Sequence, residues 1–92
     1  MKTIYKYPLS LVDRQDLSLP RGAEILDVQL QCGQLCLWAI VDTDAKFRSD
    51  YVVRIEGTGQ GPIPFDHRSS LLRRTIQQRG MVWHVFVMVE GK

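Results

Sequence analysis

The sequence lacks any apolar run long enough to cross a membrane. Its longest apolar stretch covers residues 81–89, whereas a membrane-spanning helix needs about 20 consecutive apolar residues. Residues 1–8 also lack the apolar centre of a secretory signal peptide. We therefore expect no membrane partner and a cytoplasmic location.

Residues that bind metals or carry out catalysis are scarce. The chain has only two cysteines, Cys32 and Cys36, and two histidines, His67 and His84. The cysteines are predicted to point to opposite faces of a hairpin, which argues against a disulfide or a shared metal site. Two histidines without a clear third ligand make a weak metal site, and no serine lies in a nucleophile-elbow sequence. We predict no metal, no cofactor, no catalytic residue and hence no enzyme.

A strong excess of one charge is lacking too. Twelve Lys and Arg residues against ten Asp and Glu give a net charge of +2, too little to indicate nucleic-acid binding by the whole chain. Hydrophobic residues make up 45% of the sequence, which argues against disorder. A length of 92 residues suits one domain, placed at residues 1–92.

Short segments with alternating or apolar residues, separated by turn residues, indicate strands. They cover residues 3–7, 15–19, 26–32, 35–41, 51–56 and 81–89. Residues 9–12 could extend the first strand after a bend, residues 42–50 are predicted as an exposed loop, and residues 70–77 fit either a strand or a helical turn. The sequence predicts an all-β fold, an antiparallel sandwich or small barrel of six to seven strands with little or no helix.

The densest strand pattern covers residues 26–41, which we interpret as a β-hairpin. We place its turn at Gly33-Gln34, where glycine accepts a positive φ; a turn at Cys32-Gly33 would leave the faces unchanged. The apolar face is predicted as core: Leu26, Val28, Leu30, Leu35, Leu37, Ala39 and Val41. On the mixed face, either a loop or strand covers the apolar residues, or four residues form a protein interface: Gln29, Cys36, Trp38 and Ile40.

Residues 81–89 form an almost unbroken apolar run, which predicts a strand covered on both faces. Such a strand has too little polar character for an exposed edge, so we expect it at the centre of a sheet or covered by another subunit. Strands that are apolar on both faces in so short a chain favour a homo-oligomer.

Two segments indicate a ligand site. The segment Gly57–Pro64 can bring backbone N–H groups close to an anion, although it lacks the lysine of a P-loop and could be only a wide turn. The segment Arg68–Arg79 is basic; an arginine beside an aromatic ring can hold phosphate or a nucleobase, but charge also protects edge strands. The predicted ligand-binding residues are Thr58, Gly59, Gln60, Arg73, Arg74 and His84.

Several strings occur in an order that resembles a family of small, mostly uncharacterised phage and prophage proteins, which open with a KTIWKYPL-like string. They are Lys2–Leu9, Leu19–Ala23, Leu35–Asp42, Gly57–Gly59 and Val82–Phe86. The chain departs from this pattern at Cys32, where Asn-Gly is familiar, and it continues past the usual end. The resemblance implies a phage-encoded, cytosolic, non-virion protein.

By analogy with small phage proteins, we expect a non-enzymatic binding protein in the host cytoplasm. It would inhibit a host defence protein or sequester a nucleotide-type signal, so its partners would be a host protein or a small phosphorylated ligand. The alternative is a small nucleic-acid-binding regulator that uses the segment Arg68–Arg79.

Overall fold

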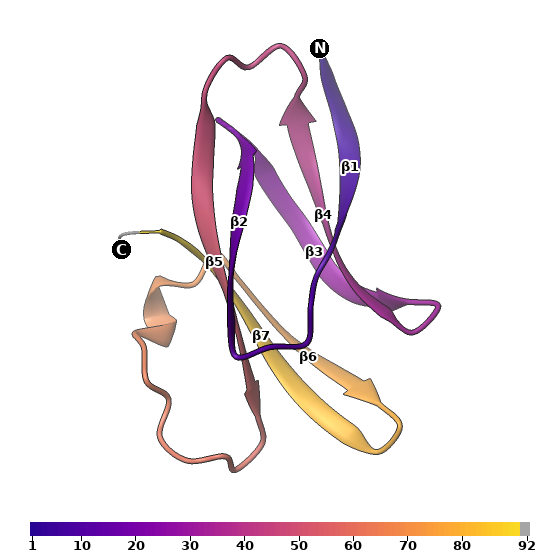
Figure 1. Cartoon of the computed structure of the whole chain (residues 1–92), viewed down its shortest axis with the longest axis vertical. Helices are drawn as coiled ribbons and strands as arrows, with labels where there is room; N and C mark the ends of the chain where they lie inside the picture. Colours follow the sequence, from indigo (N-terminus) through magenta and orange to yellow (C-terminus); the bar gives the residue numbers. More distant parts are fainter. Residues whose placement is uncertain (91–92) are drawn as a thin grey trace.

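Two antiparallel sheets pack face to face in the computed structural model, which describes residues 1–90 (Figure 1). The strands are β1 (Lys2–Pro8), β2 (Arg14–Pro20), β3 (Glu24–Gln31), β4 (Gln34–Asp42), β5 (Arg48–Gly57), β6 (Leu72–Gln78) and β7 (Met81–Val89). One sheet has the order β1-β4-β3 and the other β2-β5-β7-β6. The only helical element within residues 1–90 is a 3-10 turn, η1 (His67–Ser69). The predicted all-β sandwich is confirmed.

The core lies between the sheets, because side chains alternate along each strand and the inward set is apolar. Its largest fully buried members are Leu19, Val28, Leu37, Val41, Val53, Val85 and Val87. Burying one such side chain contributes roughly 1.5–3 kcal/mol before the entropy cost. Strand β7 pairs with both β5 and β6, which confirms its predicted central position.

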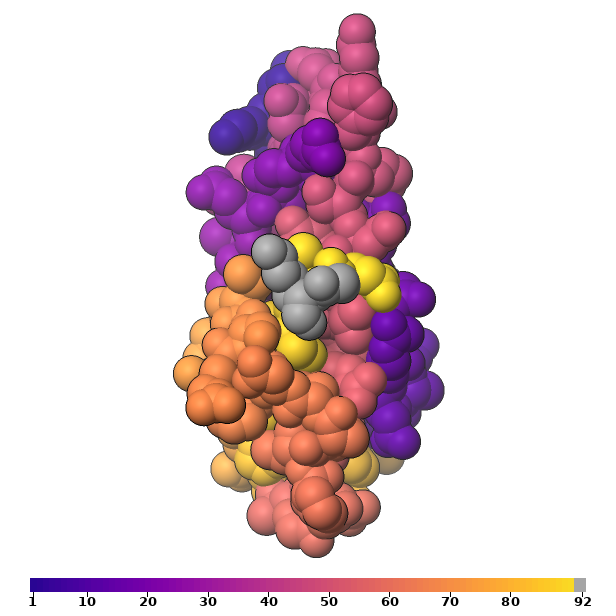
Figure 2. Space-filling model, turned by 90° about the vertical axis from the view of Figure 1, so that its left-hand side faces the viewer, coloured from indigo at the N-terminus to yellow at the C-terminus, as the bar shows by residue number. Residues whose placement is uncertain are grey.

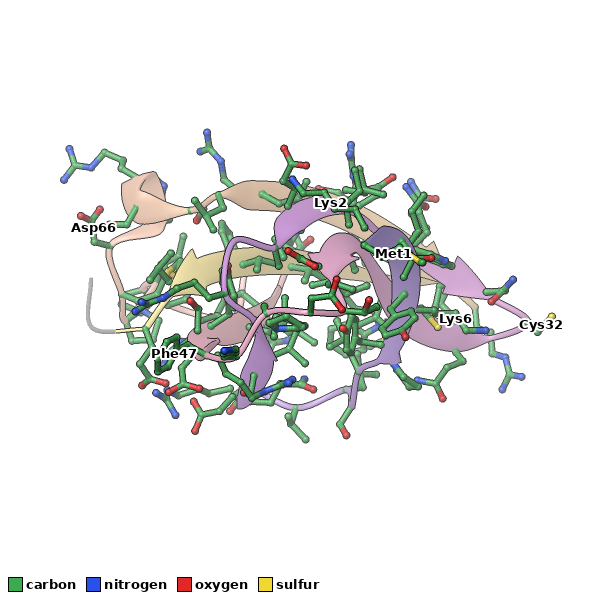
Figure 3. All side chains as sticks on the ribbon, turned by 90° about the horizontal axis from the view of Figure 1, so that it is seen from above. Met1, Lys2, Lys6, Cys32, Phe47 and Asp66 are labelled. Carbon is green, nitrogen blue, oxygen red and sulfur yellow. The ribbon has the colours of Figure 1, made fainter. Side chains whose placement is uncertain are left out.

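The hairpin turn lies at Cys32-Gly33, so its placement at Gly33-Gln34 was wrong and the second possibility is correct. Cys32 and Gly33 have φ angles of 51° and 80°, as a two-residue turn with positive φ at both central positions requires. Figure 3 shows Cys32 at the tip of the hairpin, pointing away from the protein. Positive φ at both positions matches the right-handed twist of the strands, which favours this register.

A β-bulge changes the predicted core at the start of the hairpin. The β3–β4 register shifts between Ile25 and Asp27, so Ile25 packs against the core while Leu26 is 42% exposed. The prediction of Leu26 as core was therefore wrong, since one extra residue reverses the faces on one side of a bulge. The rest of that face is buried or packs against the core, as predicted.

Two further segments differ from the sequence-based expectation, and a third, which the sequence left open between strand and helical turn, is now assigned. Strand β5 begins at Arg48, because residues 48–50 pair with β2, so the predicted loop is shorter. Residues 9–13 do not extend β1; they cross from one sheet to the other and bury Leu9. The ambiguous segment is strand β6.

The segment between β5 and β6, residues 58–71, covers part of the outer face of the four-stranded sheet (Figure 2). Phe65 of this segment packs edge-on against Phe86 of β7, with ring centroids 5.1 Å apart. The Arg54 guanidinium lies 4.8 Å from the centroid of Phe65. Phe65 of the same chain thus covers Phe86. The apolar character of β7 therefore does not require a second subunit, and the homo-oligomer stays a prediction.

No helix within residues 1–90 has the length and apolar character needed to span a membrane.

Candidate functional sites

The first site, the end groove, consists of two adjoining hollows at one end of the sandwich. Their volumes are about 390 and 420 Å³, within the range of about 300–1,000 Å³ typical of ligand pockets. Both hollows are lined by Leu11, from the β1–β2 connection, and by Trp83 of β7. Trp83 also packs against the core, so it forms a fixed wall that the two hollows share.

The two hollows differ in their linings. The first opens between the sheets and is lined by apolar residues of both, including Leu30, Leu35 and Ile76. The second lies beside the segment after β5 and includes two acidic residues, Asp13 and Glu56. No Lys, Arg or His lines either hollow among residues 1–90.

Hydrogen bonds hold the β1–β2 connection in place over this end. The Leu9 N–H donates to the Leu35 carbonyl at 2.9 Å, and the Ile55 N–H donates to the Asp13 carbonyl at 3.1 Å. Between these anchors, the Gln15 side chain bonds both the N–H and the carbonyl of Ser10. The connection is therefore fixed to both sheets, and it leaves Leu11 and Val12 51% and 46% exposed at the lip of the groove.

The second site, the outer hollow, lies on the outer face of the four-stranded sheet around His84. The His84 Nε2 lies 2.7 Å from Thr58 Oγ1, and its Nδ1 lies 3.0 Å from Thr75 Oγ1. A space of about 250 Å³ lies on the side of Thr58 and Gly59, and one of about 210 Å³ lies on the side of Arg73. Strands β6 and β7 and the segment after β5 together position these groups.

The structure brings together five of the six predicted ligand-binding residues around the outer hollow: Thr58, Gly59, Arg73, Arg74 and His84. Gln60 instead lines the end groove. Arg74 borders the outer hollow, but its Nε donates to Asp27 Oδ1 of β3 at 2.7 Å. Burial opposes ionisation of Asp27, and hydrogen bonds from Gln29, the Val28 N–H and Arg74 outweigh it, so the Asp27 pKa lies below its ordinary value.

The basic segment Arg68–Arg79 is divided among different parts of the surface. Arg68 pairs with Asp66 at 3.4 Å, while Arg74 pairs with Asp27 across the sheets. Arg73 opposes Phe86 on the outer face, and Arg79 lies in the β6–β7 turn. These arginines therefore do not form the continuous basic surface expected of a nucleic-acid interface.

The third surface is the outer face of the three-stranded sheet, which carries the four predicted interface residues. Gln29 is exposed and lies directly opposite Cys36, whereas Trp38 and Ile40 are half-buried. Cys36 is only 1% exposed. The Lys6 side chain bonds the Gln31 Oε1 at 2.8 Å, from β1 to β3, and so crosses the β4 strand that carries these apolar residues. A partner would meet mainly Gln29, Trp38 and Ile40.

The end groove was missed from the sequence, although Leu11 and Val12 gave one signal. They are apolar residues between Pro8 and a polar turn, where the sequence suggested only an extension of the first strand. Trp83 gave no such signal, because it lines the groove only where β7 lies next to the β1–β2 connection in the folded chain.

The fold and these surfaces define a small all-β sandwich domain with an open apolar end. The whole chain, residues 1–92, matches the family model described as a domain of unknown function, DUF7352. The chain belongs to this family. No curated protein and no solved structure matches it.

Proposed function

We propose that this chain is a non-enzymatic binding protein whose end groove binds an extended segment of a partner protein. The segment would carry large apolar side chains next to a lysine or arginine. The observation that supports this most strongly is the position of Trp83, a fixed aromatic wall shared by two preformed hollows. Aromatic residues in such positions are typical centres of protein-binding surfaces.

The apolar part of the partner segment is inferred from the apolar residues that line the end groove and from those exposed at its rim. Leu11 and Val12 are about half exposed, so a bound partner would remove apolar surface of both from water. Each large apolar side chain of the partner that is fully buried would contribute roughly 1.5–3 kcal/mol to binding. Because the β1–β2 connection is already fixed by hydrogen bonds, little ordering of the groove would oppose binding.

The basic part of the segment is inferred from charge. Asp13 and Glu56 line the second hollow, and neither forms an ion pair with another residue in the range 1–90. A cation bound there would meet two carboxylates and no competing positive group from the lining. A phosphorylated ligand would be repelled from the same place.

The proposed partner fits the phage context implied by the resemblance at the sequence level. A small phage protein that acts in the host cytoplasm and inhibits a host defence protein needs a protein-binding surface rather than a catalytic centre. The rival function, nucleic-acid binding, needs neighbouring arginines, and here they are dispersed.

Selection of peptides from a random display library with the full chain tests the proposal. We expect enriched peptides to combine large apolar residues with Lys or Arg. Leu11→Ser should weaken their binding several-fold, in line with about 25 cal/mol per Å² of apolar area. Leu71→Ser is the matched control, because Leu71 is 55% exposed and does not line the groove. Enrichment of acidic peptides, or equal binding by the two variants, would reject the proposal.

A further inference from the structure

The outer hollow contains hydrogen-bond donors without acceptors among residues 1–90. Arg73 lies directly opposite Phe86 in the β6–β7 pair and is an exposed residue. Within the described chain it forms no ion pair and no side-chain hydrogen bond, whereas the neighbouring Arg74 is held by Asp27. Arg73 therefore offers the donors of a planar guanidinium to a ligand.

In either neutral tautomer of His84, one of the two threonine hydroxyls bonded to its ring keeps a proton that it can donate to a ligand. A neutral imidazole donates from one ring nitrogen and accepts at the other. One of the two hydroxyls, on Thr58 or Thr75, must therefore accept from His84, and the accepting hydroxyl keeps its own proton for another acceptor. When Nδ1 carries the proton, the free hydroxyl proton belongs to Thr75.

The charges around His84 are arranged asymmetrically. In the strand register, Glu56 of β5 lies opposite His84 on one side, and Thr75 of β6 lies opposite it on the other. Arg73 is on the Thr75 side, two residues earlier in β6. An anion is thus repelled on the β5 side and attracted on the β6 side, where Arg73, Thr75, His84 and Phe86 line the hollow of about 210 Å³.

We propose that Arg73, Thr75 and His84 form a binding site for the phosphoryl group of a small phosphorylated ligand. The volume is below the usual range for whole-ligand pockets, about 300–1,000 Å³, so it suits a phosphoryl group with the rest of the ligand outside. Arg73 supplies the charge. His84, in the neutral tautomer with its proton on Nδ1, donates to the Thr75 oxygen, so the Thr75 hydroxyl donates a second hydrogen bond to the ligand. This site does not depend on the end groove.

An NMR titration of the full chain with inorganic phosphate, and then with adenosine monophosphate, at constant ionic strength tests the site. We expect saturable shifts of the Thr75 and His84 amide signals with both probes. Arg73→Ala should weaken binding about tenfold, as expected for loss of a charged hydrogen bond. Thr75→Val should weaken it less, since a neutral donor is lost.

The matched control is Arg79→Asn, which removes the same charge from the nearby β6–β7 turn. Arg79 has a φ of 52°, a conformation that asparagine tolerates, so the turn should be kept. Unchanged amide spectra of the free variants will establish that they fold. Shifts that do not saturate, or equal weakening by Arg73→Ala and Arg79→Asn, would overturn the site. Tighter, salt-sensitive binding of a single-stranded oligonucleotide that needs Arg79 would also overturn it.

Discussion

Arg74 of β6 and Asp27 of β3 form an ion pair, with Arg74 Nε 2.7 Å from Asp27 Oδ1, that joins the edges of the two sheets. Asp27 also stands at the β-bulge of β3 and accepts hydrogen bonds from the Val28 N–H and the Gln29 side chain. One carboxylate thus stabilises both an irregular strand and the contact between the layers.

The first prediction concerns the pH dependence of this contact. The folded-state pKa of Asp27 lies below its ordinary value of 3.8, so its contribution to stability is present above that pH and is lost as the pH falls through the folded-state pKa. Asp27→Asn should lower the free energy of unfolding by about 1 kcal/mol near neutral pH, since the pair is partly exposed. Urea unfolding at about pH 7 and about pH 3 should give a smaller difference at the lower pH; a constant difference would contradict this.

The second prediction concerns the hairpin turn. Cys32 occupies a left-handed conformation, with a φ of 51°, that disfavours most side chains by about 1–2 kcal/mol and disfavours asparagine less. Cys32→Asn should therefore raise the midpoint of thermal unfolding. Cys32→Ala is the control, because it removes the thiol and keeps the unfavourable conformation. Equal stability of the two variants would mean that the turn is not strained at this position.

The third prediction separates the two sides of the bulge in β3. Leu26 is 42% exposed and Leu37 is fully buried, although the sequence places both on the apolar face. Leu37→Ala should cost about 2–5 kcal/mol of unfolding free energy, as buried leucines do. Leu26→Ala should cost below about 1 kcal/mol, which is typical of surface positions. Similar losses in chemical unfolding would show that Leu26 is part of the core.

The sequence predicted the parts of the fold that depend on local pattern. The apolar run 81–89 correctly indicated a central strand, because a strand buried on both faces leaves a signal in every residue. The sequence could not predict the bulge between Ile25 and Asp27. A bulge adds one residue to one strand of a pair, and the alternating pattern of that strand does not show where the residue is added. The sequence also could not decide between a hairpin turn at Gly33-Gln34 and one at Cys32-Gly33, because both place the same side chains on each face of the hairpin.

The candidate sites were predictable to different degrees. Thr58 and His84 were both named from the sequence and are hydrogen-bonded in the structure. They meet because Thr58 directly follows β5, and β5 pairs with the strand β7 that carries His84. Gln60, two residues after Thr58, lines a different site. The end groove depends on Leu11 of the β1–β2 connection and Trp83 of β7, which are far apart in the sequence, so the exposed apolar residues of the connection were its only local signal.

The most direct test of the end groove is the fluorescence of Trp83 in a Trp38→Phe variant, where it is the remaining tryptophan. The probe is a peptide selected by the full chain that combines apolar and basic residues. We predict a saturable change in Trp83 emission, with the same midpoint as binding measured by calorimetry, and a several-fold higher midpoint after Leu11→Ser. Calorimetric binding of the peptide with unchanged Trp83 emission and an unchanged midpoint in Leu11→Ser would contradict the account.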